Sequence, residues 1–253
     1  MDTWSQIAEH YHQFVDSKAD KLRTELLYPQ LWNAMQPLTS KRILDVGCGN
    51  GFFAFHTASK GAQVEAFDNA AMISIAKLHF SHPGVNYTIA DANTPFPYPT
   101  GSFDYTCANL VLMDIDDITL LLQESHRVLK TAGQALFSIL HPCFTPPVGK
   151  FRRGIKGRIN QDYAYFHLSN YFTPPSPTAK HSFGTNIPPT NYYHRTISEY
   201  SHLFHQAGFN IATMIEPRPN DQFIKQYPHF YHAQKISIFC TFILTKSSIS
   251  SSL

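Results

Sequence analysis

Three glycines at alternate positions follow an apolar run in the segment "ILDVGCGNGFFA", residues 43–54. Gly47, Gly49 and Gly51 lie between an expected strand and an expected helix. A glycine turn in this place lets a ligand touch the main chain, because no side chain keeps the ligand away. Asp45 stands just ahead of the glycines and adds a carboxylate. The segment therefore predicts a ligand site that contains a negative charge.

Dinucleotides and S-adenosylmethionine are the two ligand classes that such a turn suggests. The dinucleotide fingerprint G-x-G-x-x-G/A needs a small third residue one turn into the helix, where this chain has Phe52. A pyrophosphate would also face the carboxylate of Asp45 across a gap of low dielectric constant. An ammonium or sulfonium group suits that carboxylate, so the sequence favours S-adenosylmethionine.

Later segments repeat this pattern of acids at strand ends. "VEAFD" ends with Asp68, "YTIADA" contains Asp91 and Ala92, and "HRVLKTAG" follows further on. Together with "ILDVGCGNG", they resemble the motifs of class I S-adenosylmethionine-dependent methyltransferases, closely over residues 40–141. Thr131 and Ala132 replace the Pro-Gly of the family's RVLKPGG signature, a departure expected to affect only a turn. The overall pattern is most similar to the broad type-11 group.

The resemblance implies how S-adenosylmethionine binds. In this family the first acid and the turn hold the methionine end, the acid after strand two binds the ribose hydroxyls, and the acid after strand three reads adenine. Tyr11 and Arg23 lie on an amphipathic segment that folds over the cofactor in similar enzymes; simple packing is the alternative for each. The expected cofactor contacts are Tyr11, Arg23, Asp45, Gly47, Cys48, Gly49, Gly51, Asp68, Asn69, Met72, Asp91, Ala92, Asn109 and Leu110.

The acceptor is expected at the carboxyl ends of strands four and five, where open α/β sheets bind ligands. Methyl transfer from a sulfonium is an in-line displacement, so alignment does most of the work and a general base is optional. His141, in "SILHPCF", is the first candidate for a proton acceptor, with a structural role as the alternative. Asp114 is a second candidate, and its alternative is to solvate its loop.

Residues 144–195 are rich in proline and aromatic residues, which indicates a folded cap and not a disordered linker. His194 and Arg195 end this cap and are expected near the mouth of the pocket, where His194 is a further catalytic candidate. Arg195 has an alternative role, an arginine-carboxylate clip that pins the cap. The cap tyrosines wall an apolar pocket or form the cap's own core; the candidates for acceptor binding are Tyr163, Tyr165, Tyr192 and Tyr193.

Charge and motifs weigh against nucleic acid as the partner. Lys+Arg 20 against Asp+Glu 18 gives a net charge of only +2. The basic run at residues 150–158 suggests an acidic substrate or a solvated loop. "ANLVLM" stands where enzymes that methylate exocyclic amines have an Asn/Asp-Pro-Pro-aromatic motif. No spacing of histidines and cysteines indicates a metal site.

The residues between these motifs predict the elements that hold them in place. Apolar runs alternate with amphipathic stretches from residue 42 to 140, which is typical of a sheet with helices on both faces. The "TISE" capping box opens a later helix that ends near Gly208, and two more strands complete the sheet. Helices are expected at 52–60, 70–80, 116–130 and 196–207, and strands at 43–46, 62–68, 85–91, 103–111, 133–140, 210–217 and 235–245.

We therefore expect a single α/β domain over residues 1–253, with a Rossmann-like, doubly wound sheet of seven strands. Residues 1–40 form an N-terminal helical lid, and residues 144–195 form a cap inserted after strand five. No membrane span is expected, and separated cysteines favour the cytoplasm. The expected function is methylation of an oxygen, nitrogen or carbon atom of a small organic molecule. The alternatives are a cofactor-binding protein without catalysis, whose cap binds a partner, and a tRNA or protein methyltransferase.

Overall fold

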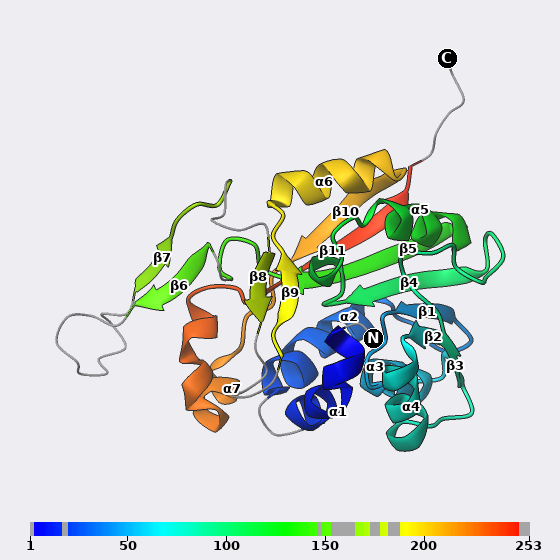
Figure 1. The fold of residues 1–253 in the computed structure, drawn as a ribbon, viewed down its shortest axis with the longest axis horizontal. Coiled ribbons are helices and arrows are strands. Elements are labelled where there is room, and N and C mark those ends of the chain that lie inside the picture. Colours follow the sequence, from blue (N-terminus) through cyan, green and yellow to red (C-terminus); the bar gives the residue numbers. More distant parts are fainter. Residues whose placement is uncertain are drawn as a thin grey trace, which may run out of the picture.

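A seven-stranded sheet forms the centre of the protein (Figure 1). The structure, a computed structural model, describes residues 3–16, 20–145, 148–152, 165–172, 178–181 and 188–247. The strands lie in the order β10-β11-β5-β4-β1-β2-β3, and β11 runs antiparallel to the other six. They are β1 (Arg42–Val46), β2 (Gln63–Asp68), β3 (Val85–Ile89), β4 (Phe103–Asn109), β5 (Leu129–Leu140), β10 (Phe209–Ile215) and β11 (Phe239–Lys246).

Helices cover both faces of this sheet, as the sequence predicts (Figure 1). On β1, Leu44 and Val46 join one buried cluster with α5 and α6, while Ile43 joins a second cluster with α2, α3 and α4. Side chains alternate between the faces of a strand, so burial on both faces requires an uninterrupted apolar run. The helices are α2 (Tyr28–Ala34), α3 (Phe52–Ala58), α4 (Ala70–His79), α5 (Thr119–Val128) and α6 (Ile197–Gln206).

The segment "LKTAG" differs from the prediction. The expected helix at residues 116–130 ends at Val128, and the chain continues directly into β5. Thr131 and Ala132, expected in a turn, lie inside β5 at an irregularity in its pairing with β4. Gly133 follows at this irregularity, where an added Cβ would lie 2.9 Å from Leu129 Cδ2. The neighbouring strand therefore overrides the local turn signal.

Short helices precede the sheet at the N-terminal end of the chain. They are α1 (Thr3–Asp16), the π-helix η2 (Leu22–Leu27) and α2, and α1 packs against α4. Two further helices were not predicted from the sequence. They are α7 (Asp221–Gln226) and the 3-10 helix η5 (Pro228–Gln234), and both lie between β10 and β11. The hydroxyl of Tyr227 donates to Glu25 Oε1 at 2.9 Å, which joins the segment between β10 and β11 to η2.

Two small hairpins form the described parts of the expected cap. β6 (Gly149–Arg152) pairs with β7 (Tyr165–Leu168), and β8 (Thr178–His181) pairs with β9 (Thr190–Tyr193). The capping box before α6 is confirmed: Thr196 Oγ1 accepts the Glu199 N–H, and Glu199 Oε2 accepts the Thr196 N–H. Among the described helices, none has the length and apolar character needed to cross a bilayer.

Candidate functional site

The glycine turn between β1 and α3 brings main chain close to two side chains from distant segments. Gly47 has φ +66°, and a Cβ there would lie 2.7 Å from Val111 Cγ2. Gly49 has φ +55°, and its Cβ position is 3.4 Å from the Tyr11 ring. The left-handed backbone favours glycine at both positions, and at Gly47 the space for a side chain is also already filled. Cys48, between them, is buried.

Asp45 supplies a buried charge beneath this turn. The residue is 1% exposed, and its Oδ2 has no hydrogen-bond partner among the described residues. Burial raises the pKa of Asp45 well above its ordinary value, and the charge of Asp68 adds to the rise. An unpaired buried carboxylate is costly unless a cation compensates it. The site therefore fits a ligand that brings a positive group to Asp45.

Asp68 ends β2 beside the same turn. Its Oδ2 accepts the Gly49 N–H at 2.8 Å, and its Oδ1 accepts the Asn69 N–H at 2.7 Å. Asn69 is the N-cap of α4, and its Oδ1 accepts the Met72 N–H at 3.0 Å. β1 and β2 are adjacent parallel strands, so the acids at their carboxyl ends meet at one edge of the sheet. The structure thus brings Asp45, Asp68, Asn69 and Met72 together around the turn.

The N-terminal helices cover the turn from above. Arg23, in η2, is 6% exposed and donates from Nη1 to the Tyr11 hydroxyl at 2.7 Å. Its Nε lies 2.6 Å from Asp20 Oδ2. His12 of α1 adds a second contact to the turn, since its Nδ1 is 3.2 Å from Asn50 Nδ2. Tyr11 therefore lies over Gly49 and is held there by Arg23, and their role as a lid over a cofactor stays a prediction.

The loop after β3 carries Asp91 and Ala92 on the far side of Asp68. Asp91 is exposed, and its Oδ1 accepts both the N–H and the side-chain amide of Asn93 at 2.9 Å. Ala92 is half-buried against the core cluster that contains Phe96. Ala90 N–H donates to the carbonyl oxygen of Asp68 at 3.2 Å, which ties this loop to the end of β2.

The carboxyl end of β4 presents two unusual groups. Leu110 has φ +59°, a left-handed conformation that is rare outside glycine and often found at functional sites. Asn109 accepts the Ser138 hydroxyl on Oδ1 at 3.0 Å, while its Nδ2 is buried with no partner among the described residues. Both residues lie next to Val111, which contacts the glycine turn.

Asp114 ends the short 3-10 helix η3 (Leu112–Asp114) that follows β4. Burial raises the pKa of Asp114 well above its ordinary value, and the charge of Asp68 adds to it. Burial raises the pKa of Tyr11 and of Tyr192, and the charge of Asp114 adds to both shifts. Its carboxyl group is thus within electrostatic range of the lid, of the acid of β2 and of the cap strand β9.

His141 engages both ring nitrogens in the protein. Nε2 lies 2.8 Å from Glu216 Oε1, and Nδ1 accepts the Cys143 N–H at 3.2 Å. Because Nδ1 accepts, the ring proton is on Nε2 and is donated to Glu216. Burial lowers the pKa of His141, although Glu216 opposes this effect. In this arrangement neither nitrogen is available to take a proton from an acceptor, which favours the structural alternative.

The cap residues next to α6 bind main-chain oxygens. His194 Nε2 is 3.0 Å from the Tyr171 carbonyl oxygen, and His194 Nδ1 has no partner among the described residues. Arg195 donates to the carbonyl oxygens of Leu112 and Ile115 at 3.0 and 2.8 Å, and also to that of Asp116. Arg195 does clip the cap to η3, but with carbonyl groups in place of the expected carboxylate.

The tyrosine candidates separate into described and undescribed side chains. Tyr192 is 2% exposed in the core cluster with α6, and the half-buried Tyr193 lies beside it on β9, its hydroxyl accepting from Asn191 Nδ2 at 3.3 Å. Tyr163 lies outside the described residues, and for Tyr165 only the main chain, in β7, is described. The run at residues 150–158 is also largely outside the described part. Among described residues, no cluster of metal ligands occurs.

Comparison with known proteins adds a family to this geometry. Residues 44–137 match the family model "Methyltransferase domain". The chain is 34% identical over 112 residues to the ubiquinone biosynthesis O-methyltransferase of Xanthomonas oryzae pv. oryzae. The aligned region covers 43% of this chain and 47% of that protein. It is 36% identical over 107 residues to the biotin biosynthesis bifunctional protein BioHC of Cellvibrio japonicus, 42% of this chain and 21% of that one. The chain therefore spans less than half the length of these relatives.

A solved structure extends the likeness to the whole fold. A putative S-adenosylmethionine-dependent methyltransferase of Listeria monocytogenes superposes with a TM-score of 0.72 at 24% identity, over 87% of this chain and 96% of that one. Residues 44–137 are therefore similar to a methyltransferase domain, and the fold is that of class I methyltransferases. The seven-stranded sheet agrees with the fold that the sequence motifs predicted.

Two contacts of the site were not predicted. His12 contacts Asn50 of the turn, and Glu216 pairs with His141 after β5. Glu216 stands in an "EP" pair after "NIATMI", but no local pattern connects it with His141, 75 residues away. Arg127 belongs to the recognised "HRVLK" segment, yet its partners in the loop before β4 are visible only in the structure.

Proposed function

We propose that this protein transfers a methyl group from S-adenosylmethionine to an oxygen, nitrogen or carbon atom of a small organic molecule. The observation that carries the proposal is the buried, unpartnered Oδ2 of Asp45 below a left-handed glycine turn. That oxygen needs a cation, and the turn needs a ligand that approaches main chain. The family match and the fold agree with this assignment.

Each part of the cofactor has residues in the structure that suit it. Asp45 and the turn would hold the charged methionine end, under the lid of Tyr11 and Arg23. Asp68 would accept from the ribose hydroxyls, a carboxylate-to-diol contact of the kind that dinucleotide folds use. Asp91 and Ala92 would meet adenine, and Asn109 and Leu110 would border the sulfur end. When bound, the cofactor would supply an activated methyl group, which the acceptor would attack in line while S-adenosylhomocysteine leaves.

On the acceptor side, Asp114 is the best-placed proton acceptor. Burial raises the pKa of Asp114, which makes its carboxylate a stronger base than an exposed one. His141 already donates to Glu216, and His194 is bound to the Tyr171 carbonyl oxygen. We assign His141 and Arg195 to holding the acceptor pocket in shape, and His194 Nδ1 to a contact with the acceptor.

A small acceptor agrees with what surrounds the site. The half-buried Tyr193 of β9 offers an aromatic ring to the acceptor, while Tyr192 beside it belongs to the core cluster. The Xanthomonas relative is named for ubiquinone biosynthesis and O-methylation, which makes a phenolic oxygen one acceptor to test. We also place the protein in the cytoplasm, because its four cysteines are free and three are buried.

The test is binding followed by turnover. Isothermal titration with S-adenosylhomocysteine should show one site, and Asp45→Asn should weaken it while Asp117→Asn, at an exposed carboxylate, should not. Transfer of labelled methyl groups from S-adenosylmethionine should then be measured on phenols, amines and carbon acids. Binding with no transfer to any acceptor would favour the cofactor-binding protein without catalysis. Transfer only to tRNA or protein would favour the other alternative, and no binding would refute the proposal.

A further inference from the structure

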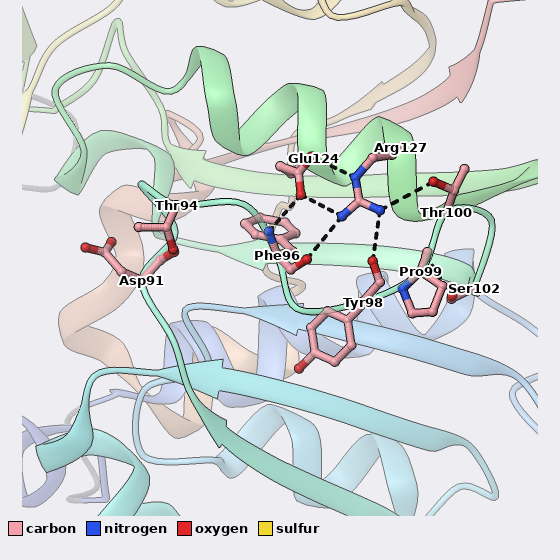
Figure 2. A network of polar contacts seen from close by, with 9 residues as sticks. All are labelled: Asp91, Thr94, Phe96, Tyr98, Pro99, Thr100, Ser102, Glu124 and Arg127. Carbon is pink, nitrogen blue, oxygen red and sulfur yellow. Dashed lines mark hydrogen bonds and ion pairs between the residues drawn. The ribbon is translucent and has the colours of Figure 1, made fainter.

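An ion pair outside the site fastens the loop between β3 and β4 (Figure 2). Arg127, near the end of α5, donates from Nε and Nη2 to the two carboxylate oxygens of Glu124 at 2.7 and 2.6 Å. Its Nη1 and Nη2 also donate to the carbonyl oxygens of Tyr98 and Phe96 at 2.8 and 3.1 Å. Nη1 is 3.4 Å from Thr100 Oγ1. We call Arg127 and Glu124 the loop clip.

Glu124 also bonds the loop directly. Its Oε2 accepts the Phe96 N–H at 2.7 Å, so both main-chain polar groups of Phe96 are held by the clip. Residues 90–102 contain no helix or strand. A loop without regular structure must satisfy its buried main-chain groups through side chains. The clip therefore decides where this loop runs.

Phe96 connects the loop clip with the floor of the site. It is 4% exposed, and its ring centroid lies 5.0 Å from that of Phe67. Phe67 directly precedes Asp68, whose carbonyl oxygen accepts the Ala90 N–H. The loop is thus fixed at its start by β2 and at its middle by the clip, with Asp91 and Ala92 between the two points.

Asp91 is held in one orientation within that span. Both hydrogen bonds from Asn93 go to its Oδ1, and the Thr94 N–H and hydroxyl donate to its carbonyl oxygen at 3.1 and 2.8 Å. Its Oδ2 accepts no hydrogen bond from a described residue. Figure 2 shows the Asp91 side chain pointing away from Arg127. This oxygen remains available to accept from an exocyclic amino group.

We propose that Arg127 and Glu124 are positioning residues for base recognition: by fixing the loop at Phe96, they hold Asp91 and Ala92 where adenine is distinguished from other bases. The inference rests on the proposed function, because it takes the adenine side of the cofactor to lie at Asp91. The hydrogen bonds of Arg127 go to Glu124 and to the loop at residues 96–100, and the proposal gives Arg127 its effect on the cofactor through this loop.

The test compares two ligands that differ at one group of the base. S-inosylhomocysteine has a carbonyl oxygen where S-adenosylhomocysteine has the adenine amino group, so it would face Asp91 with an acceptor. Titration calorimetry should show that the wild-type protein prefers S-adenosylhomocysteine by at least about tenfold, since an unpaired polar group disfavours the wrong ligand. Arg127→Gln should reduce this preference to below about threefold, because the loop loses its charged donor.

Matched variants separate positioning from general stability. Lys130→Gln breaks an ion pair with Asp104 at 2.9 Å, three residues further along the chain, and should retain the preference. If Arg127→Gln does not fold, the preference for S-adenosylhomocysteine is measured in Arg127→Lys and Glu124→Gln. Lysine keeps the charge but not the two-pronged geometry, and Glu124→Gln keeps the shape but not the charge. Both should lie between the wild type and Asp91→Ala.

A second measurement needs no cofactor. Hydrogen exchange of the Ala92–Phe96 amides should be faster in the clip variants than in Lys130→Gln. Weaker binding of both ligands with an unchanged preference, or unchanged exchange in the loop, would overturn the inference. Failure of the wild-type protein to bind S-adenosylhomocysteine would instead overturn the proposed function, so the two failures are distinguishable.

Discussion

The carboxylate of Asp68 accepts the main-chain N–H of Gly49 at 2.8 Å, which joins the end of β2 to the glycine turn after β1. The acid and the turn are therefore one unit and not two neighbouring features. A ligand that reaches the turn main chain also meets this carboxylate. The same contact places a negative charge near Asp45, whose pKa is raised by burial and next by Asp68.

Asp68→Ala should weaken S-adenosylhomocysteine binding by at least about tenfold, roughly 1.4 kcal/mol, because the ribose contact and the hold on the turn are both lost. Titration calorimetry measures the change. Glu65→Ala is the matched control, since Glu65 lies on the same strand and bonds Asn86 Nδ2 of β3. An affinity equal to that of the control would remove Asp68 from the site.

Asp45→Asn should stabilise the ligand-free protein and weaken cofactor binding. Because the pKa of Asp45 is raised in the folded state, the folded protein binds more protons than the unfolded chain, and Asp45 reduces stability as pH rises above the ordinary carboxyl pKa. Thermal melts at neutral pH should therefore show a higher Tm for Asp45→Asn. An equal or lower Tm would contradict the assignment of an uncompensated buried carboxylate.

Cofactor binding should also release a proton in the pH range where Asp45 is partly protonated. A cation beside the carboxylate favours its ionised form, so affinity should rise with pH in the wild type and less in Asp45→Asn. Calorimetry in buffers of different ionisation enthalpy counts the proton. Equal proton release in the two proteins would exclude Asp45 as its source.

Tyr11→Phe should speed cofactor dissociation by about tenfold, because it removes the hydrogen bond from the buried Arg23 while keeping the ring over Gly49. The ring centroids of Trp4 and Tyr11 are 5.4 Å apart, so the fluorescence of Trp4 can report cofactor dissociation in a stopped-flow experiment. Gln13→Ala, which changes only an exposed pair with Glu9, is the control. Identical rates would mean that α1 packs without acting as a lid.

Asp114→Asn should lower kcat by about 100-fold with little change in the affinity for S-adenosylhomocysteine, if the acceptor must lose a proton during transfer. The exposed Asp116→Asn is the matched control on the same loop. Rates measured over a pH range should also lose their acidic limb in Asp114→Asn. Full activity would assign Asp114 to its loop alone.

His141→Gln should reduce stability and flatten its pH dependence. Burial lowers the pKa of His141, so the unfolded chain binds more protons below its ordinary pKa of about 6.5, and stability falls as pH falls through that region. Urea unfolding at pH 5.5 and 7.5 measures this difference, with the exposed His202→Gln as control. If His141→Gln kept the wild-type dependence of the unfolding free energy on pH but lost turnover, His141 would instead be assigned as a general base.

Local signals were sufficient for much of the sheet and for the residues on its edge. Asp45 and Asp68 could be placed together from sequence because they end adjacent parallel strands, and the capping box of Thr196 and Glu199 is complete within four residues. Thr131 and Ala132 show the limit: a local turn signal was overridden by pairing with β4. The helices α7 and η5, in a segment with little periodicity, were not predicted.

The sequence by itself determined the fold class and the cofactor-side acids, because short-range periodicity and glycine spacing encode them. Only the tertiary structure decided that Tyr11 covers Gly49, that His141 donates a hydrogen bond to Glu216, and that Arg127 bonds the main chain of Phe96. These contacts join residues 31 to 75 positions apart: Arg127 and Phe96 are separated by 31 positions, and His141 and Glu216 by 75. Such pairs depend on how separate elements pack in space, and nothing in the local pattern of either partner specifies the other.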